Sequence, residues 1–311
     1  MTHEEFIEFY LNIKSLSVAP TTLDGYRRVL NRFLPLSDEI SELDLIQAQE
    51  IITEMAHTGI TGATVRRHTS ILHQYGKYIV KYQKVAYNPF DGVEQPKKIE
   101  IDNLHNKVYS EDSLVKLFRE LRTEPLMWRA YISAAIDSGA RRGELVGLRW
   151  CDLDFERDCL RIQRAAFKLS GKPQATKEPK GRRSRTVYLT RHTMHLLRMW
   201  RMAQQSDTVR EGYVWDFDFY IFGKNGDMLS LYAPSAWWRR FLKRHRLPVH
   251  RLHDLRHTCA TLLLRNGVDV RTVSQRLGHA ALKTTMLYLE PDGEAARDTM
   301  ENILKKAVKN I

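Results

Sequence analysis

The stretch LGHAALKTTMLYLE, residues 277–290, contains a histidine and a tyrosine whose spacing could serve catalysis. Tyr288 stands in a run that otherwise predicts an ordinary helix, and His279 follows a glycine that should open it. A tyrosine in a helix usually packs in the core or on the surface. A phenol becomes a nucleophile only when a base removes its proton, because with a pKa near 10 it is mostly neutral at pH 7.

The stretch SGARRGEL, residues 138–145, places two arginines after a glycine. Gly139 is expected to end one helix, with Arg141 and Arg142 at the start of the next. A helix N-terminus beside a guanidinium group suits a phosphate, because it offers free N–H groups and a planar bidentate donor. Taken alone, the stretch is explained better by surface arginines at a helix cap.

The stretch KGRRSRTVYL, residues 180–189, predicts the cationic tip of a hairpin followed by a short strand. Lys180 lies at the tip among Arg182, Arg183 and Arg185. Such a tip suits an arm that contacts phosphates, and a solvated basic loop would have the same composition.

The stretch HRLHDLRHTCATLLL, residues 250–264, adds histidines and a third arginine. His253 and Arg256 are three residues apart and should share a helix face. His253 and His257 have the spacing of a zinc pair, but the sequence offers no third ligand at a natural spacing and lacks the glutamate of metalloproteases. We therefore expect no metal site here.

Together these stretches fit phosphoryl transfer without a metal. Arginines can neutralise the oxygens of a phosphate, a general acid can protonate the leaving 5′ oxygen, and a base can take the proton of an attacking phenol. The sequence contains no Walker motif, acidic metal cluster or glycine-rich phosphate loop that would indicate another route.

The composition indicates a two-domain protein and favours a polyanion as its partner, with a soluble protein that is basic for no functional reason as the alternative. The chain has 311 residues, 43% of them hydrophobic, and a formal net charge of +12. Three cysteines, without paired spacing, are expected to be reduced thiols. Because the sequence has no signal peptide and no apolar run of membrane-spanning length, we expect a cytoplasmic protein without membrane contact.

The elements that must position these residues differ between the two parts of the chain. The N-terminal part predicts a four-helix bundle, with Ser41 as the cap of the third helix; the helices cover residues 4–14, 19–36, 41–59 and 61–83. The second part predicts a helix capped by Ser110, two helices separated by Gly139, strands over 159–169 and 185–189 that pair with each other, and mainly helices from residue 190 onward.

The stretches SGARRGEL, HDLRHTCATLLL and LGHAALKTTMLYLE resemble the three signature boxes of the tyrosine recombinases, also called phage integrases. The resemblance covers about residues 107–295, and the helical N-terminal part is similar to the core-binding domain of that family. It implies a mainly α fold with a small β-sheet (α+β). The implied domains are a four-helix, SAM-like core-binding domain over residues 1–100, a linker over 101–107, a catalytic domain over 108–297, and a C-terminal helix over 298–311.

The resemblance also implies the catalytic residues, namely Arg141, Lys180, His253, Arg256, His279 and Tyr288. The two arginines would clamp the scissile phosphate and His279 would hydrogen-bond it, with Glu144 supporting Arg141. Tyr288 would form a 3′-phosphotyrosyl link, with His253 as the general acid/base partner and Lys180 as the acid for the 5′ oxygen. Lys172 and Lys177 lie in the same loop as Lys180 and remain alternatives to it.

The implied activity is site-specific DNA recombination through a Holliday junction, without metal or ATP, for integration or excision of a mobile element or prophage. The expected partners are double-stranded DNA with an inverted-repeat core site, further copies of the chain in a homotetramer, and an excisionase or DNA-bending protein. In the tetramer residues 298–311 are expected to dock on a neighbouring protomer, with docking on their own domain as the alternative. The expected DNA contacts are Arg66, Arg67, Lys77, Arg182 and Arg183.

Other functions remain open at this point. Xer-like resolution of chromosome or plasmid dimers uses the same chemistry, as does a type IB topoisomerase-like relaxase. A catalytically silent DNA-binding regulator would keep the fold, and a zinc-dependent nuclease is the most remote alternative.

Overall fold

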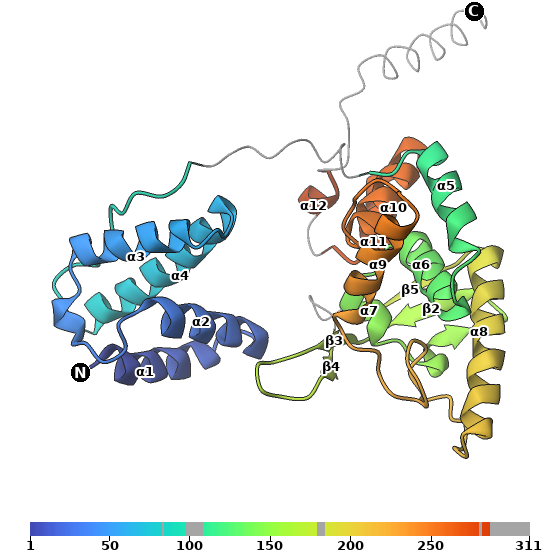
Figure 1. Ribbon diagram of the computed structural model, residues 1–311, viewed down its shortest axis with the longest axis horizontal. Coiled ribbons are helices and arrows are strands. Elements are labelled where there is room, and N and C mark those ends of the chain that lie inside the picture. Colours follow the sequence, from blue (N-terminus) through green and yellow to red (C-terminus); the bar gives the residue numbers. More distant parts are fainter. Residues whose placement is uncertain (83, 98–107, 179–183, 280–281, 287–311) are drawn as a thin grey trace, which may run out of the picture. The chain divides into compact units, whose positions relative to one another are not determined.

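The computed structural model describes residues 1–82, 84–97, 108–178, 184–279 and 282–286 (Figure 1). Its contacts divide the chain into two compact units. Unit 1 comprises Met1–Ile101 and Lys168–Pro173, and unit 2 comprises Asp102–Phe167 and Gln174–Ile311. The predicted linker, residues 101–107, and the predicted C-terminal helix, residues 298–311, lie outside the described residues.

Unit 1 contains the four predicted helices. Their bounds are α1 His3–Ser15, α2 Pro20–Phe33, α3 Leu45–His57 and α4 Gly62–Lys81. Each turns apolar residues inward at helical spacing, so that Phe6, Leu30, Ile52 and Leu72 meet in one core. His3 is also fully buried, with its Nδ1 3.0 Å from the hydroxyl of Tyr75.

The predicted cap of α3 at Ser41 is wrong. Residues Ile40–Glu42 form a separate 3-10 turn, and Asp44 is the N-cap of α3. The Asp44 carboxylate accepts a hydrogen bond from the N–H of Gln47 at 2.8 Å, and the Gln47 side chain accepts one from the N–H of Asp44 at 3.0 Å. This reciprocal pair satisfies two N–H groups at once, which a cap at Ser41 could not do without Glu or Gln three residues later.

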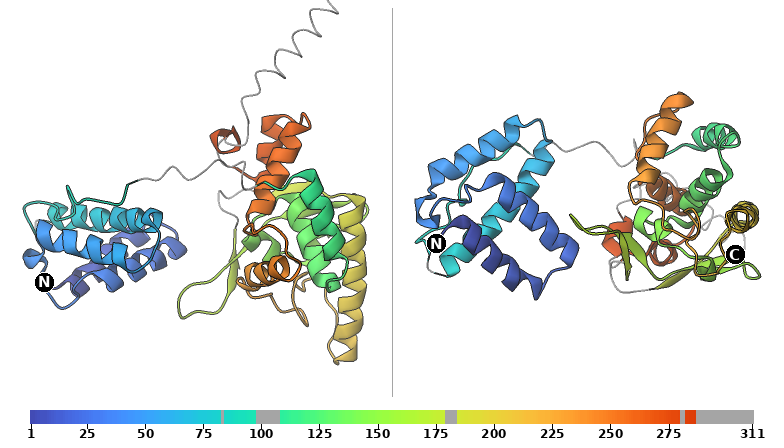
Figure 2. Two further views of the ribbon diagram at one scale, coloured as in Figure 1. Left: turned by 45° about the horizontal axis from the view of Figure 1, so that its top comes forward. Right: turned by 60° about the horizontal axis from the view of Figure 1, so that its bottom comes forward.

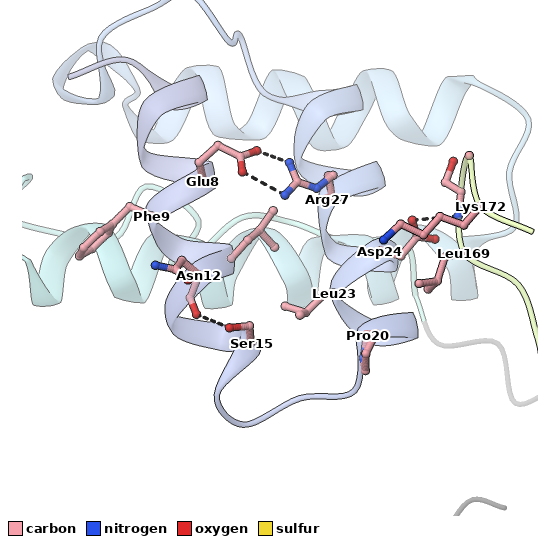
Figure 3. A pocket seen from close by; sticks show the side chains of 13 residues that line it. Glu8, Phe9, Asn12, Ser15, Pro20, Leu23, Asp24, Arg27, Leu169 and Lys172 are labelled. Atoms are coloured by element: carbon pink, nitrogen blue, oxygen red, sulfur yellow. Dashed lines mark hydrogen bonds and ion pairs between the residues drawn. The ribbon is translucent and has the colours of Figure 1, made fainter. Parts of the chain in front are cut away.

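A pocket of unit 1 lies over α1 and α2, beside residues 169–172 (Figure 3). Arg27 forms an ion pair with Glu8 across it, and the N–H of Ser170 donates to Asp24 at 3.3 Å. None of the residues predicted to be catalytic lines this pocket, although Lys172, an alternative to Lys180, does.

Unit 2 is mainly helical. Its described helices are α5 Glu111–Leu121, α6 Leu126–Ser138, α7 Arg142–Val146, α8 Arg191–Arg210, α9 Ala233–Arg244, α10 Asp254–Arg265, α11 Val270–Leu277 and α12 Leu282–Met286. Ser110 caps α5 as predicted, accepting from the N–H of Ser113 at 3.2 Å. Figures 1 and 2 show α8 along one edge of this unit.

The strands of unit 2 form two small antiparallel sheets. One has the order β1-β2-β5, from Leu153–Asp154, Cys159–Ile162 and Arg185–Tyr188, and the other pairs β3 Ala165–Phe167 with β4 Ala175–Lys177. The predicted pairing between the two strand regions is confirmed, because Leu160 lies opposite Val187.

The predicted single strand over 159–169 is interrupted after Ile162. Gln163 donates to the carboxylate of Asp152 at 2.7 Å, and Arg164 forms an ion pair with the same group. These two contacts draw the chain away from β5 and separate β2 from β3.

The core of unit 2 consists of aromatic and aliphatic side chains from α5, α6, α8, α9 and the larger sheet, with Trp150, Trp238, Tyr131, Phe222 and Phe241 fully buried. A smaller cluster of Ala260, Val273 and Leu277 joins α10 to α11. No helix in the described ranges is both long and apolar enough to cross a membrane.

Candidate active site

The turn between α6 and α7 places the first arginine. Gly139 has a φ of 61°, a left-handed conformation that favours glycine, and a Cβ there would come within 2.5 Å of the Leu277 side chain. The chain then reaches Arg141, the N-cap residue of α7. Because α7 spans only five residues, the guanidinium groups, rather than a helix N-terminus, supply the positive charge that this stretch brings to the site.

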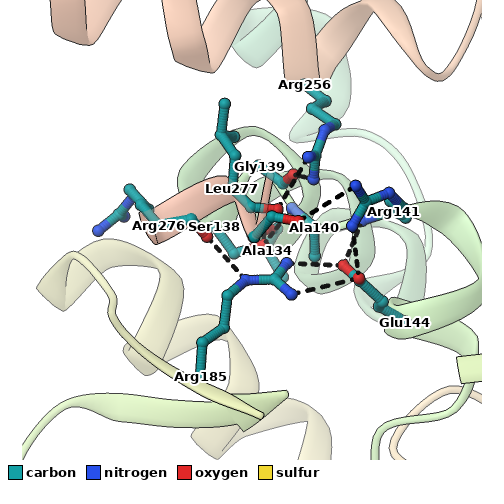
Figure 4. Close-up of polar contacts among 11 residues, drawn as sticks. Ala134, Ser138, Gly139, Ala140, Arg141, Glu144, Arg185, Arg256, Arg276 and Leu277 are labelled. Atoms are coloured by element: carbon teal, nitrogen blue, oxygen red, sulfur yellow. Dashed lines mark hydrogen bonds and ion pairs between the residues drawn. The ribbon is translucent and has the colours of Figure 1, made fainter. Parts of the chain in front are cut away.

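Glu144 is a buried carboxylate between two guanidinium groups, with only 1% of its side chain exposed. It accepts from the Arg141 N–H at 2.8 Å and from Arg141 Nη1 at 3.0 Å, and Arg185 Nη2 and Nη1 donate to it at 2.7 and 3.2 Å. Figure 4 shows both arginines directed at this one carboxylate. Burial raises the pKa of Glu144, but the hydrogen bonds and charges of Arg185 and Arg141 outweigh it, so the pKa is lowered.

Arg256 of α10 approaches the turn between α6 and α7 from the side opposite to Arg185 (Figure 4). The residue is only 3% exposed. Its Nη1 donates to the carbonyl of Gly139 at 2.7 Å, and its Nη2 donates to the carbonyl of Leu277 at 2.8 Å. Arg256 therefore joins the end of α6 to the end of α11.

The C-terminal end of α11 holds three arginines through its main chain. The last carbonyls of a helix lack partners within the helix and carry the negative end of its dipole. The carbonyls of residues 276–278 accept, in order, from Arg185 Nε at 2.8 Å, Arg256 Nη2 at 2.8 Å and Arg141 Nη2 at 3.3 Å. This row of carbonyls positions both arginines that were predicted to clamp the phosphate.

His279 follows this row directly. Its Nδ1 lies 2.8 Å from the hydroxyl of Thr285, which is fully buried. Burial lowers the pKa of His279 to about 4, and the positive charges of the nearby arginines act in the same direction. The ring is therefore neutral at pH 7.

His253 lies at the rim of the site, at the N-cap position of α10. Its ring meets the ring of His257 nearly at right angles, with centroids 5.0 Å apart. Although the residue keeps some exposed surface, desolvation lowers the pKa of His253 to about 4, and His257 and Arg256 lower it further. This ring is also neutral at pH 7 and can accept a proton.

A basic pocket opens beside Arg141 and His253. Its walls also include the cationic residues Arg142, Arg239 and Arg251. The guanidinium of Arg142 is held by the hydroxyl of Ser235 at 2.9 Å. An open surface of this charge suits an extended polyanion.

No group of three or more metal-binding side chains occurs in the part of the chain that the structure describes. Lys180, Arg182, Arg183 and Tyr288 lie outside it, so their predicted roles remain predictions. Lys177, the other alternative to Lys180, lies in β4 with its ammonium group 4.8 Å from the ring of Phe167.

The predicted DNA contacts of α4 differ in their surroundings. Arg66 Nη1 donates to the carbonyls of Pro96 and Lys97 at 3.0 and 2.8 Å, so it ties this segment to α4. Arg67 and Lys77 are exposed.

Arg185 is the residue whose place the sequence interpretation missed. It was grouped with the cations of the hairpin tip, yet its side chain is only 9% exposed and faces Glu144. The alternation of side chains along the strand could have predicted this burial, because Arg185 and the buried Val187 are two residues apart and lie on the same face.

Comparisons with known proteins find relatives over most of the chain. Residues 107–294, more than half of the chain, match the model of the phage integrase family. The XerC-like tyrosine recombinase of Caldanaerobacter subterraneus is 28% identical over 87% of this chain and 74% of its own length. The ICEBs1 integrase of Bacillus subtilis is 24% identical over 96% of this chain and 82% of its own. The Tn1549 transposon integrase, solved in complex with a circular intermediate DNA, superposes with a TM-score of 0.77 at 18% identity, covering 97% of this chain and 99% of that one.

Proposed function

The chain belongs to the phage integrase family and is a tyrosine site-specific recombinase, and we propose that it integrates and excises a mobile element or prophage. The observation that carries the proposal is that three separate segments of the chain converge on one site, bringing together Arg141, the neighbouring His253 and Arg256, and His279. The similarity to the ICEBs1 integrase, over 96% of this chain, favours a mobile element as the substrate.

Double-stranded DNA is the partner of the reaction. The Tn1549 integrase was solved with DNA, and the net charge of +12 and the basic pocket beside Arg141 suit the same ligand. We extend the proposal to an inverted-repeat core site bound by a homotetramer, with an excisionase or DNA-bending protein setting the direction.

The first chemical step is an attack on phosphorus. The phenol oxygen of Tyr288 forms a bond to the scissile phosphorus while the bond from phosphorus to the 5′ oxygen breaks. His253, neutral at pH 7, accepts the phenol proton, and Lys180 gives a proton to the departing 5′ oxygen. Arg141 and Arg256 balance the negative charge on the remaining phosphate oxygens.

The product of this step is a 3′-phosphotyrosyl link and a free 5′-OH. Because one phosphate ester has replaced another, a 5′-OH from a second duplex can attack the link without ATP. Two such exchanges in sequence pass through a Holliday junction. The scheme assigns no proton transfer or charge balance to a metal.

Resolution of chromosome or plasmid dimers is a second candidate, favoured by the 28% identity to a XerC-like recombinase. The two candidates differ in substrate. Recombination between the ends of the element that carries the gene would support integration and excision, whereas recombination confined to two copies of a chromosomal site would support dimer resolution.

A covalent adduct tests the chemistry itself. A suicide duplex, nicked close to the cleavage site so that the 5′-OH diffuses away, should trap the native chain on DNA in the presence of EDTA. Tyr288→Phe should bind the same duplex without forming the adduct. If both proteins bind and neither forms an adduct on any site flanking the gene, the chain is a DNA-binding regulator. An adduct that persists in Tyr288→Phe would show that another residue is the nucleophile.

A further inference from the structure

Arg185 is a buried cation for which the reaction scheme has no use. It starts β5, pairs with Ile162 of β2, and directs its guanidinium away from solvent. Three of its nitrogens donate within the protein, two to the carboxylate of Glu144 and Nε to the carbonyl of Arg276. A planar fork with this arrangement of donors is a property of arginine that lysine lacks.

The contacts of Arg185 connect three separate elements. Glu144 belongs to α7, 41 residues away, and Arg276 lies in the last turn of α11, 91 residues away. The Glu144 carboxylate also accepts a hydrogen bond from Arg141. The carbonyl of Gly278, two residues after Arg276, accepts a second one from Arg141. Arg141 and Arg185 are therefore fixed by the same two groups, the Glu144 carboxylate and the carbonyl row of α11.

The guanidinium of Arg185 also packs tightly against the turn that precedes His279. A Cβ at Gly278 would lie 2.8 Å from its Nη1 and 3.0 Å from its Cζ. The Arg185 guanidinium thus fills the space next to Gly278, while Arg256 and Arg141 donate to the carbonyls of Leu277 and Gly278.

We infer that Arg185 is a positioning residue of this recombinase, whose guanidinium sets the location of Arg141 and of the turn before His279. The inference rests on the proposed function, because it concerns the phosphate site of that reaction. Two effects follow from the geometry. Arg185 binds the Glu144 carboxylate together with Arg141, so the negative charge of Glu144 is divided between two guanidinium groups. Arg185 also fixes the end of α11 relative to β5.

A shift of about 1 Å in a reacting group can cost up to about a hundredfold in rate. The effect should therefore appear in the rate of covalent bond formation. The affinity for DNA should change little, because the fork of Arg185 is occupied by protein groups.

The test uses the full chain and the nicked suicide duplex, with Arg185→Gln, Arg185→Lys and the control Arg161→Gln. Arg161 is an exposed arginine of the neighbouring strand β2, so its replacement removes a charge from the same sheet without touching Glu144. The measurements are the unfolding transition, the DNA dissociation constant and the single-turnover rate of adduct formation at saturating DNA, below the start of unfolding.

We expect Arg185→Gln to lower the adduct rate by at least about tenfold while DNA affinity stays within about threefold. Arg185→Lys should remain slow despite its charge, because one ammonium group cannot bridge the Glu144 carboxylate and the Arg276 carbonyl as the fork does. Arg161→Gln should match the native chain.

Several outcomes would overturn the inference. They are an unchanged rate in a folded Arg185→Gln, full recovery in Arg185→Lys, a loss confined to DNA affinity, or a failure of both Arg185 variants to fold, which would make Arg185 a stability residue. Absence of an adduct with the native chain would instead count against the proposed function.

Discussion

Replacement of Gly278 by alanine should destabilise unit 2. The loss should exceed that of the same change at a glycine with a similar backbone conformation but with no atoms close to the added Cβ. Gly278 has a φ of 67°, and a Cβ there would come within 2.8 Å of the Arg185 guanidinium. Since Glu144 and the carbonyl of Arg276 hold that guanidinium, it cannot move aside without losing a hydrogen bond.

The control is Gly267, which has a φ of 79° and nothing within 4 Å of an added Cβ. Both substitutions place alanine in the left-handed region at a cost of about 1–2 kcal/mol, partly offset by about 0.4–1 kcal/mol from a less flexible unfolded chain. Gly278→Ala should in addition lose one charge-assisted hydrogen bond, about 1.5–3 kcal/mol. The difference between the two variants should therefore be about 2 kcal/mol.

Urea unfolding followed by tryptophan fluorescence measures this difference, because all six tryptophans of the chain belong to unit 2. Gly267→Ala should also keep the native rate of adduct formation, whereas Gly278→Ala should be slower. Equal losses of unfolding free energy in the two variants would refute the reasoning, because they would mean that the Arg185 guanidinium yields freely and that the turn is not fixed by it.

Three further predictions concern other contacts. The Thr285 hydroxyl fixes the tautomer of His279, so Thr285→Val should slow adduct formation about tenfold, the equivalent of one hydrogen bond. Thr285→Ser keeps the hydroxyl and should keep the native rate. Equal single-turnover rates for the two variants would show that the hydroxyl has no such role. Burial lowers the pKa of His3 to about 4, so the unfolded chain takes up its proton first as pH falls. The contribution of His3 to the unfolding free energy should therefore be constant above pH 6.5 and decline between pH 6.5 and 4. His3→Gln should reduce that decline in urea titrations followed by circular dichroism, and an unchanged slope would contradict the assignment. Asp44→Ala should cost about 1 kcal/mol of unfolding free energy and Ser41→Ala almost nothing in the same assay, and the reverse order would restore Ser41 as the cap.

The elements that the sequence predicted correctly depend on local signals. Helical spacing of apolar residues located α1 to α4, and Gly139 marked the end of α6 because few other residues adopt its backbone conformation. The position of the α3 cap was harder to predict, since Ser41 and Asp44 are both good caps three residues apart. Gln47 decides between them through its bond to the N–H of Asp44.

The features that the sequence could not predict depend on partners far along the chain. The break between β2 and β3 follows from the side chain of Asp152, which binds both Gln163 and Arg164. Arg185 is buried because it contacts Glu144 and Arg276, which are 41 and 91 residues away in the sequence. The basic sequence that precedes Arg185 instead suggests an exposed side chain. The resemblance of the three boxes predicted roles for Arg141, Arg256 and His279, but it gave no indication that main-chain carbonyls, which have no signature in a sequence, position the two arginines.

Those carbonyls also bear on how the reaction depends on pH. A main-chain carbonyl does not titrate, and the carboxylate that shares the task, Glu144, has a pKa lowered by Arg185 and Arg141, so it stays ionised to lower pH than an ordinary glutamate. The proposed clamp of Arg141 and Arg256 therefore keeps its form at neutral and alkaline pH. At these pH values a pH–rate profile of adduct formation should then report the groups that give and take protons, rather than the loss of the contacts that hold the two arginines.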